Sequence, residues 1–109
     1  RYAAADEYLT SLSENRTDDL GAKSQYYLGQ SLYDQGKYNE AITSLVRVRT
    51  VYSRYEEWLM RSYLLLGDCY VKLNDKRNAA EMYRAVVTKY SGTPIGDEAQ
   101  QKLRKVQWG

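Results

Sequence analysis

The sequence predicts an all-α protein in which one helix–turn–helix unit occurs twice. When the 109-residue chain is shifted by 38 residues, eight of the 32 positions in 22–53 are identical in 60–91, whereas about two identities are expected by chance. The identical pairs are Ser24/Ser62, Leu28/Leu66, Gly29/Gly67, Ala41/Ala79, Val48/Val86, Thr50/Thr88, Tyr52/Tyr90 and Ser53/Ser91. Apolar residues recur every three to four positions in both units, as on one face of a helix. The single Pro and the scarcity of β-branched runs disfavour strands.

The first predicted helix covers residues 2–14. Its apolar residues align, at a spacing of 36, with those of a later helix. The pairs are Tyr2/Tyr38, Ala5/Ala41, Leu9/Leu45 and Leu12/Val48. This alignment makes 2–14 the second helix of an earlier repeat, with an apolar face that the chain covers only in part. We therefore expect the chain to be part of a larger repeat protein.

The first complete unit is predicted to pair a helix over 18–34 with one over 38–52. Thr17 is a candidate N-cap for the first of these helices, because its hydroxyl can accept a hydrogen bond from a free backbone N–H. Between the two helices, Gly36 can adopt the left-handed conformation that commonly ends a helix.

The second unit is predicted to pair helices over 56–73 and 76–90, and a last helix covers 95–107. Asn74 takes the place of the turn glycine, and Asn tolerates the left-handed conformation best after Gly. Thr93 suits the N-cap of the last helix and Pro94 its first position. Arg104 stands where the units have Gly29 and Gly67, so we expect this helix to be a solvated cap.

Both units carry a glycine in the middle of their first helix. Gly costs about 1 kcal/mol relative to Ala at such a position. Its presence at Gly29 and at Gly67 therefore indicates that a second helix crosses closely there. Ala41 and Ala79 are the small residues expected to face these glycines.

The pattern Leu28-Gly29…Gly36…Ala41…Leu45…Val48 resembles the tetratricopeptide repeat, and its second copy shares most of these positions. The resemblance implies a right-handed α-solenoid in a single domain over 1–109, with a half-repeat, two repeats and a capping helix. It also implies a non-catalytic scaffold that binds a protein or peptide. The period here is 38 rather than the family's 34, and Trp58 is expected to fill the gap in the longer connection.

In this family the first helix of each pair lines the concave groove. Carried over onto this chain, the resemblance predicts partner-binding residues at Lys23, Tyr26, Gln30, Tyr33, Arg61, Leu64 and Asp68. Aromatic and Arg anchors of this kind suit peptide recognition. Two other interpretations stay open: an ordinary solvated face, and self-association through the open N-terminal face, which would make a homo-oligomer.

Residues 89–99 are similar to connections in bacterial cell-envelope members of the family, such as Tol–Pal-associated and outer-membrane assembly lipoproteins, although Ser91 stands where those members usually have Pro. This likeness implies a periplasmic or outer-membrane-associated location, with the cytoplasm as the alternative.

The composition disfavours several kinds of chemistry. The chain has no His, which removes His-based metal sites and catalytic triads, and its one cysteine, Cys69, is expected to be a packing residue. No glycine-rich phosphate loop is present, and a net charge of +2 gives no nucleic-acid footprint. We therefore expect no cofactor, no nucleic-acid partner and no membrane insertion by this segment. A hydrolase using two carboxylates, drawn from Asp34, Asp68 and Glu98, is the enzymatic alternative, and it would need a closed pocket.

Overall fold

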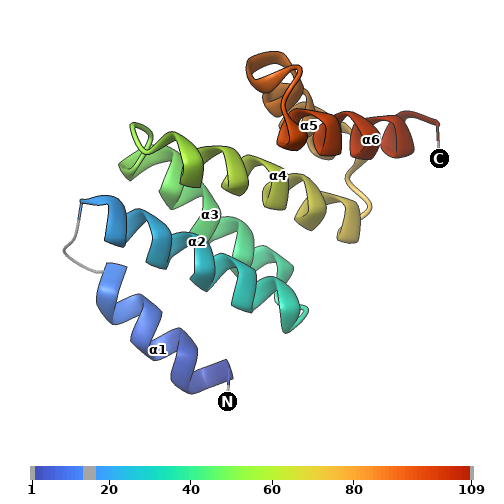
Figure 1. Cartoon of the computed structure of the whole chain (residues 1–109). Coiled ribbons are helices and arrows are strands. Elements are labelled where there is room, and N and C mark those ends of the chain that lie inside the picture. Colours follow the sequence, from blue (N-terminus) through green and yellow to red (C-terminus); the bar gives the residue numbers. More distant parts are fainter. Residues whose placement is uncertain (1, 14–16, 109) are drawn as a thin grey trace. The chain divides into compact units, whose positions relative to one another are not determined.

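The structure is a computed structural model that describes residues 2–13 and 17–108. These residues form six helices and no strand (Figure 1). The helices are α1 (Tyr2–Ser13), α2 (Asp19–Asp34), α3 (Tyr38–Val51), α4 (Glu56–Lys72), α5 (Lys76–Tyr90) and α6 (Pro94–Trp108). The all-α prediction is confirmed, and helix ends agree with the sequence to within one residue. The predicted end of the first helix, Glu14, lies outside the described residues.

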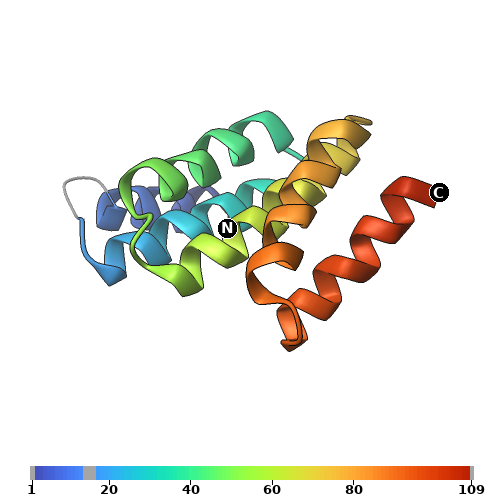
Figure 2. The same cartoon turned by 90° about the horizontal axis from the view of Figure 1, so that it is seen from above.

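The chain divides into two compact units, Arg1–Ser62 and Tyr63–Gly109, here called the N-terminal and the C-terminal unit. In the N-terminal unit, α2 packs against both α1 and α3 (Figures 1 and 2). In the C-terminal unit, α5 packs against α6. The boundary falls inside α4, so each unit contains part of this helix. Among the described helices, none is long and apolar enough to cross a membrane.

The helix ends follow the local sequence with one correction. Gly36 and Asn74 both have positive φ angles, of 79° and 59°, as predicted for the two turns. Thr93 caps α6 by accepting a hydrogen bond from Gly96 N at 3.2 Å. Thr17 does not cap α2. Asp18 does so instead, because α2 begins one residue later and the Asp18 carboxylate accepts from Gly21 N at 3.0 Å.

The two mid-helix glycines lie at close helix crossings, as predicted. A Cβ atom at Gly29 would lie 2.6 Å from Leu45 Cδ2, and one at Gly67 would overlap the ring of Tyr83. The side chains nearest to the glycines are Leu45 and Tyr83 rather than the predicted Ala41 and Ala79. Large side chains one turn further along α3 and α5 fill the space that the missing Cβ leaves.

Trp58 belongs to the core of the N-terminal unit and lies in α4, within the predicted helix 56–73, rather than in the connection itself. It lies in the first turn of α4, is 7% exposed, and clusters with Ala22, Val48 and Tyr52. The connection between α3 and α4 covers residues 52–55, and α4 begins at Glu56 as predicted. Nearby, the hydroxyl of Tyr52 donates to Ser13 O at 3.1 Å. This bond ties the end of α1 to the same core.

Candidate functional site

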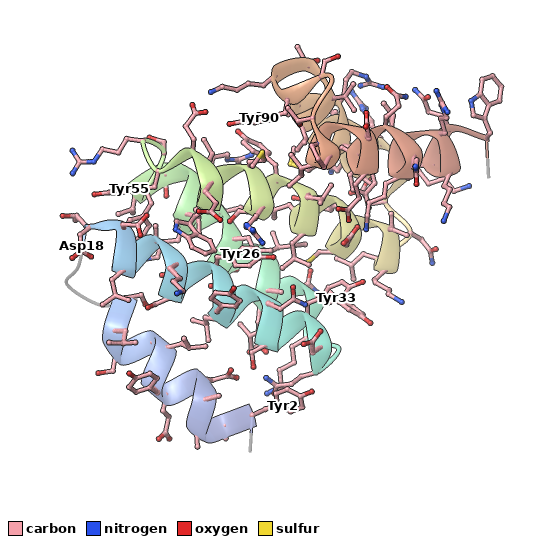
Figure 3. The ribbon with its side chains drawn as sticks, in the orientation of Figure 1. Tyr2, Asp18, Tyr26, Tyr33, Tyr55 and Tyr90 are labelled. Carbon is pink, nitrogen blue, oxygen red and sulfur yellow. The ribbon has the colours of Figure 1, made fainter. Side chains whose placement is uncertain are left out.

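The N-terminal unit carries five of the seven predicted site residues. Lys23, Tyr26, Gln30 and Tyr33 recur every three to four residues, so they follow one side of α2. Figure 3 shows Tyr26 near the middle of α2 and Tyr33 toward its end. Lys23 is exposed, the other three are partly exposed, and the fifth residue, Arg61, is exposed on α4.

Trp58 brings two of these residues together. Its ring centroid lies 5.8 Å from that of Tyr26 and 5.8 Å from that of Tyr27, and the two Tyr rings meet edge to face at 5.2 Å. The guanidinium of Arg61 lies 5.5 Å from the Trp58 ring centroid, a cation–π contact between residues three apart on α4. These four residues, Tyr26, Tyr27, Trp58 and Arg61, are called the Trp58 cluster below.

Polar contacts hold the cluster in place. The indole N–H of Trp58 donates to Asp19 Oδ1 at 3.1 Å, which links the first turn of α4 to the first turn of α2. Arg61 also pairs with Glu57 at 3.2 Å. Because the indole is buried and hydrogen-bonded, it supports the more exposed side chains around it. One of these is Tyr27, which is 41% exposed and can therefore contact a partner.

The remaining predicted residues on α2 lie nearer its C-terminal end. Gln30 Nε2 donates to Asp34 Oδ1 at 3.0 Å, one turn further along the helix. The ring of Tyr33 meets that of Tyr38, at the start of α3, with centroids 5.4 Å apart and planes at 62°. Both side chains therefore already have contacts within the unit, and both keep part of their surface exposed.

The other two predicted residues lie in the C-terminal unit, where both have structural contacts. Leu64 is only 9% exposed and belongs to the hydrophobic core. Asp68 accepts from the hydroxyl of Tyr83 at 2.5 Å and from Lys102 Nζ at 2.9 and 3.1 Å. Leu64 therefore offers little surface to a partner, and Asp68 joins α4, α5 and α6.

The sequence analysis missed Tyr27 and Trp58 as site residues. Tyr27 was passed over because it lies next to Tyr26 rather than one turn away. Trp58 was expected only to fill the gap at the connection. Its spacing of three residues from Arg61, within the predicted helix 56–73, is the signal that would have placed both on one helix face.

The chain's one thiol is buried and shows no reactive character. Cys69 is fully buried in α4. Burial, helped by the neighbouring Asp68 carboxylate, raises the pKa of this thiol from 9.0 to about 12. A thiol with so high a pKa is a weak nucleophile at neutral pH. Within the described part of the chain, no group of three or more Cys, Asp and Glu side chains is placed to hold a metal ion.

Comparison with known protein families accounts for the repeat. The model of the tetratricopeptide repeat matches residues 20–91, which cover α3, α4, α5 and all but the first residue of α2. No curated protein matches the chain. The cell-envelope location, which depends on residues 89–99, stays a prediction. The repeat match covers well over half of the chain and coincides with the paired helices. The chain therefore belongs to the tetratricopeptide repeat family, whose general role is protein–protein interaction.

Proposed function

We propose that this chain is a non-catalytic protein-binding module that holds a peptide segment of its partner against α2 and the start of α4. The Trp58 cluster is the observation that carries the proposal. It places two Tyr rings and a guanidinium on one buried indole, and Tyr, Trp and Arg are the residues that most often dominate binding energy at interfaces.

The cluster is suited to binding because it is already ordered. Trp58 is fixed by its core contacts and by Asp19, and Arg61 is held between Glu57 and the indole. Little side-chain entropy is then lost when a partner binds, which favours affinity. Tyr rings contribute large contact area with few rotatable bonds.

The proposed contact surface extends from the cluster along α2. Lys23 lies one turn before Tyr26, and Gln30 and Tyr33 continue toward the C-terminal end of the helix. The amide of Gln30 and the hydroxyl of Tyr33 are suited to hydrogen bonds with an extended backbone. Leu64 and Asp68 support the framework of the C-terminal unit in this proposal.

The test is selection of partners from a displayed peptide library, followed by affinity measurement on the selected peptides. The variants are Tyr26→Ala, Arg61→Glu and the double variant. A control, Glu81→Ala/Arg84→Ala, removes two exposed side chains of α5. We expect each anchor change to cost about 2 kcal/mol, or about thirtyfold in Kd, and the control to leave Kd unchanged.

Arg61→Glu is the decisive variant, because it reverses an exposed charge and leaves the core intact. Circular dichroism at the binding temperature verifies that each variant is folded. If the folded anchor variants bind selected peptides as tightly as the wild type, and the α5 control does not, the assignment of the site to α2 and α4 is wrong.

A further inference from the structure

Two pairs of tyrosine rings lie along the side of α2 that the proposed function uses. Tyr26 and Tyr27 meet edge to face, with ring centroids 5.2 Å apart and planes at 72°. Tyr33 meets Tyr38 of α3 in the same way, at 5.4 Å and 62°. All four side chains keep part of their surface exposed. Each pair therefore forms a corner between two steeply inclined rings, and these are called the tyrosine corners below.

The spacing of the two tyrosine corners matches one extended peptide conformation. Tyr26 and Tyr33 are seven residues apart, which is about 10.5 Å along the helix axis. Figure 3 shows Tyr26 near the middle of α2 and Tyr33 toward its end. A polyproline II segment rises about 9.3 Å over three residues, and every third residue returns to the same side. Prolines three positions apart can therefore reach both corners at once.

The polar side chains between and beside the corners are rich in hydrogen-bond donors. Lys23 and Arg61 have donors and no acceptor, and the amide of Gln30 has both. The nearby carboxylates of Asp34 and Glu57 are already paired with Gln30 and Arg61. A proline-rich backbone has carbonyl acceptors but few N–H donors, and the polyproline II conformation leaves these carbonyls without internal partners. Donor side chains are therefore what such a backbone requires.

Two other forms of bound peptide fit this surface less well. An amphipathic helix binds through a row of apolar anchors in a hydrophobic groove. The residues that follow this side of α2, namely Lys23, Tyr26, Gln30 and Tyr33, include no aliphatic side chain. A peptide strand binds by extending the open edge of a sheet, and the described residues contain no strand. Surfaces lined with aromatic rings are instead typical of proline-rich recognition.

We infer that the segment bound at this site is a proline-rich stretch in the polyproline II conformation, with prolines three positions apart on the two tyrosine corners. The inference rests on the proposed function and names the class of peptide that the site takes. One proline packs between Tyr26 and Tyr27, whose rings are both supported by Trp58 at 5.8 Å. A second packs between Tyr33 and Tyr38. Both the rings and the peptide are ordered before binding, which favours affinity.

The test compares two ten-residue peptides of identical composition. PPAPPAPPAA repeats its proline pairs every three residues, whereas PPAAPPAAPP repeats them every four, so that successive pairs turn to different sides of the peptide. Binding is followed by the fluorescence of Trp58 in a Trp108→Phe background, because the chain has two tryptophans. Trp108 is 86% exposed, so this background should fold normally. We expect the peptide with the three-residue spacing to bind about tenfold more tightly.

Variants at the second corner test whether the spacing is read there. Tyr33→Leu and Tyr38→Leu keep a large apolar side chain but remove one ring. We expect each to weaken binding of PPAPPAPPAA about tenfold and to abolish the preference between the two peptides. The matched control is Tyr8→Leu on α1, where the side chain is 65% exposed and outside the site. It should change neither affinity nor preference, and circular dichroism verifies that every variant is folded.

Two results would overturn the inference: equal affinity of the Trp108→Phe chain for the two peptides, and no change in Trp58 fluorescence with either. Peptides selected from the displayed library separate this inference from the proposed function. If they lack prolines three apart and still lose affinity with Arg61→Glu, the proline-rich class is wrong while the proposed site stands. If Arg61→Glu leaves selected and synthetic peptides bound as tightly as before, the proposed site itself is wrong.

Discussion

The helix crossings at Gly29 and Gly67 occupy equivalent positions in the two repeats, but side chains of different chemical type fill them. At Gly29 the inserted side chain is Leu45, which needs no polar partner. At Gly67 it is Tyr83, whose hydroxyl donates to the adjacent Asp68. The position of Asp68 corresponds to Gln30 in the first repeat, where the amide bonds to Asp34 instead.

The comparison shows that the same kind of close crossing can be filled by an aliphatic or by an aromatic side chain, and that only the tyrosine needs a hydrogen-bond partner. A buried Tyr hydroxyl must find an acceptor, and a carboxylate drawn into that role favours a cation beside it. Lys102 of α6 supplies this cation. In the first repeat the buried hydrogen bonds between α2 and α3 are made instead by Gln25 and Ser44.

The largest effect on stability is expected when the tyrosine of the second crossing is introduced at the first crossing. Leu45→Tyr should cost about 3 kcal/mol, because the ring overpacks the crossing and its hydroxyl meets Gln30 rather than a carboxylate. Urea unfolding followed by helical circular dichroism measures the loss. The added change Gln30→Asp should recover about 1 kcal/mol by supplying the acceptor. Strict additivity of the two changes would contradict the comparison.

Replacing each crossing glycine with alanine should destabilise the two crossings to different extents, with a smaller effect than Leu45→Tyr. Gly67→Ala should cost about 2 kcal/mol, because the Tyr83 ring is rigid and held by Asp68. Gly29→Ala should cost less, about 1 kcal/mol, because its added Cβ would crowd Leu45 Cδ2 and Cγ, while Ala gains about 1 kcal/mol in helix propensity. Thermal unfolding of both variants decides this. Arg104→Ala, an exposed position of α6, serves as the neutral control.

Removing single hydrogen bonds to Asp68 at the second crossing should reduce the stability by less than the glycine substitution there. Tyr83→Phe removes one donor to Asp68 and should cost about 1 kcal/mol. Lys102→Met should cost no more, because this ion pair is partly exposed. A double-mutant cycle in urea should give a coupling energy, because both donors share one carboxylate. Independent effects of the two changes would show that Asp68 does not link them.

The smallest effect on stability should come from Cys69, beside Asp68. Its raised pKa of about 12 keeps the folded thiol neutral, while the unfolded thiol ionises near 9.0. This contribution is therefore complete below pH 9 and is lost as the pH rises toward 12. Urea unfolding at pH 8 and pH 10.5 should show a larger decrease for the wild type than for Cys69→Ala.

Labelling provides a direct measure of the same thiol. At pH 8 a thiol reagent should react with the folded chain on the order of a hundredfold more slowly than with the chain in urea. Equal rates would mean that Cys69 is accessible in the folded chain.

The sequence alone determined the helices and the turns between them. Apolar periodicity located the six helices, and the ends of α2 to α6 to within one residue, because a helix that buries one face must repeat its apolar residues at its own period. Gly36 and Asn74 marked the turns, since few residues tolerate a positive φ angle. Gly29 and Gly67 marked the close crossings for a similar local reason, as only a missing Cβ permits such an approach.

The identity of the facing and supporting side chains was decided by the tertiary structure. Which residue enters beside a glycine depends on the rotation and offset of the second helix, so Leu45 and Tyr83 could not be told from Ala41 and Ala79 by spacing. The roles of Trp58 and Asp68 are likewise set by hydrogen bonds to other helices, and the role of Leu64 is set by its burial. Periodicity identifies a face of a helix, whereas the choice between binding surface, core and polar link depends on what the rest of the chain places against that face.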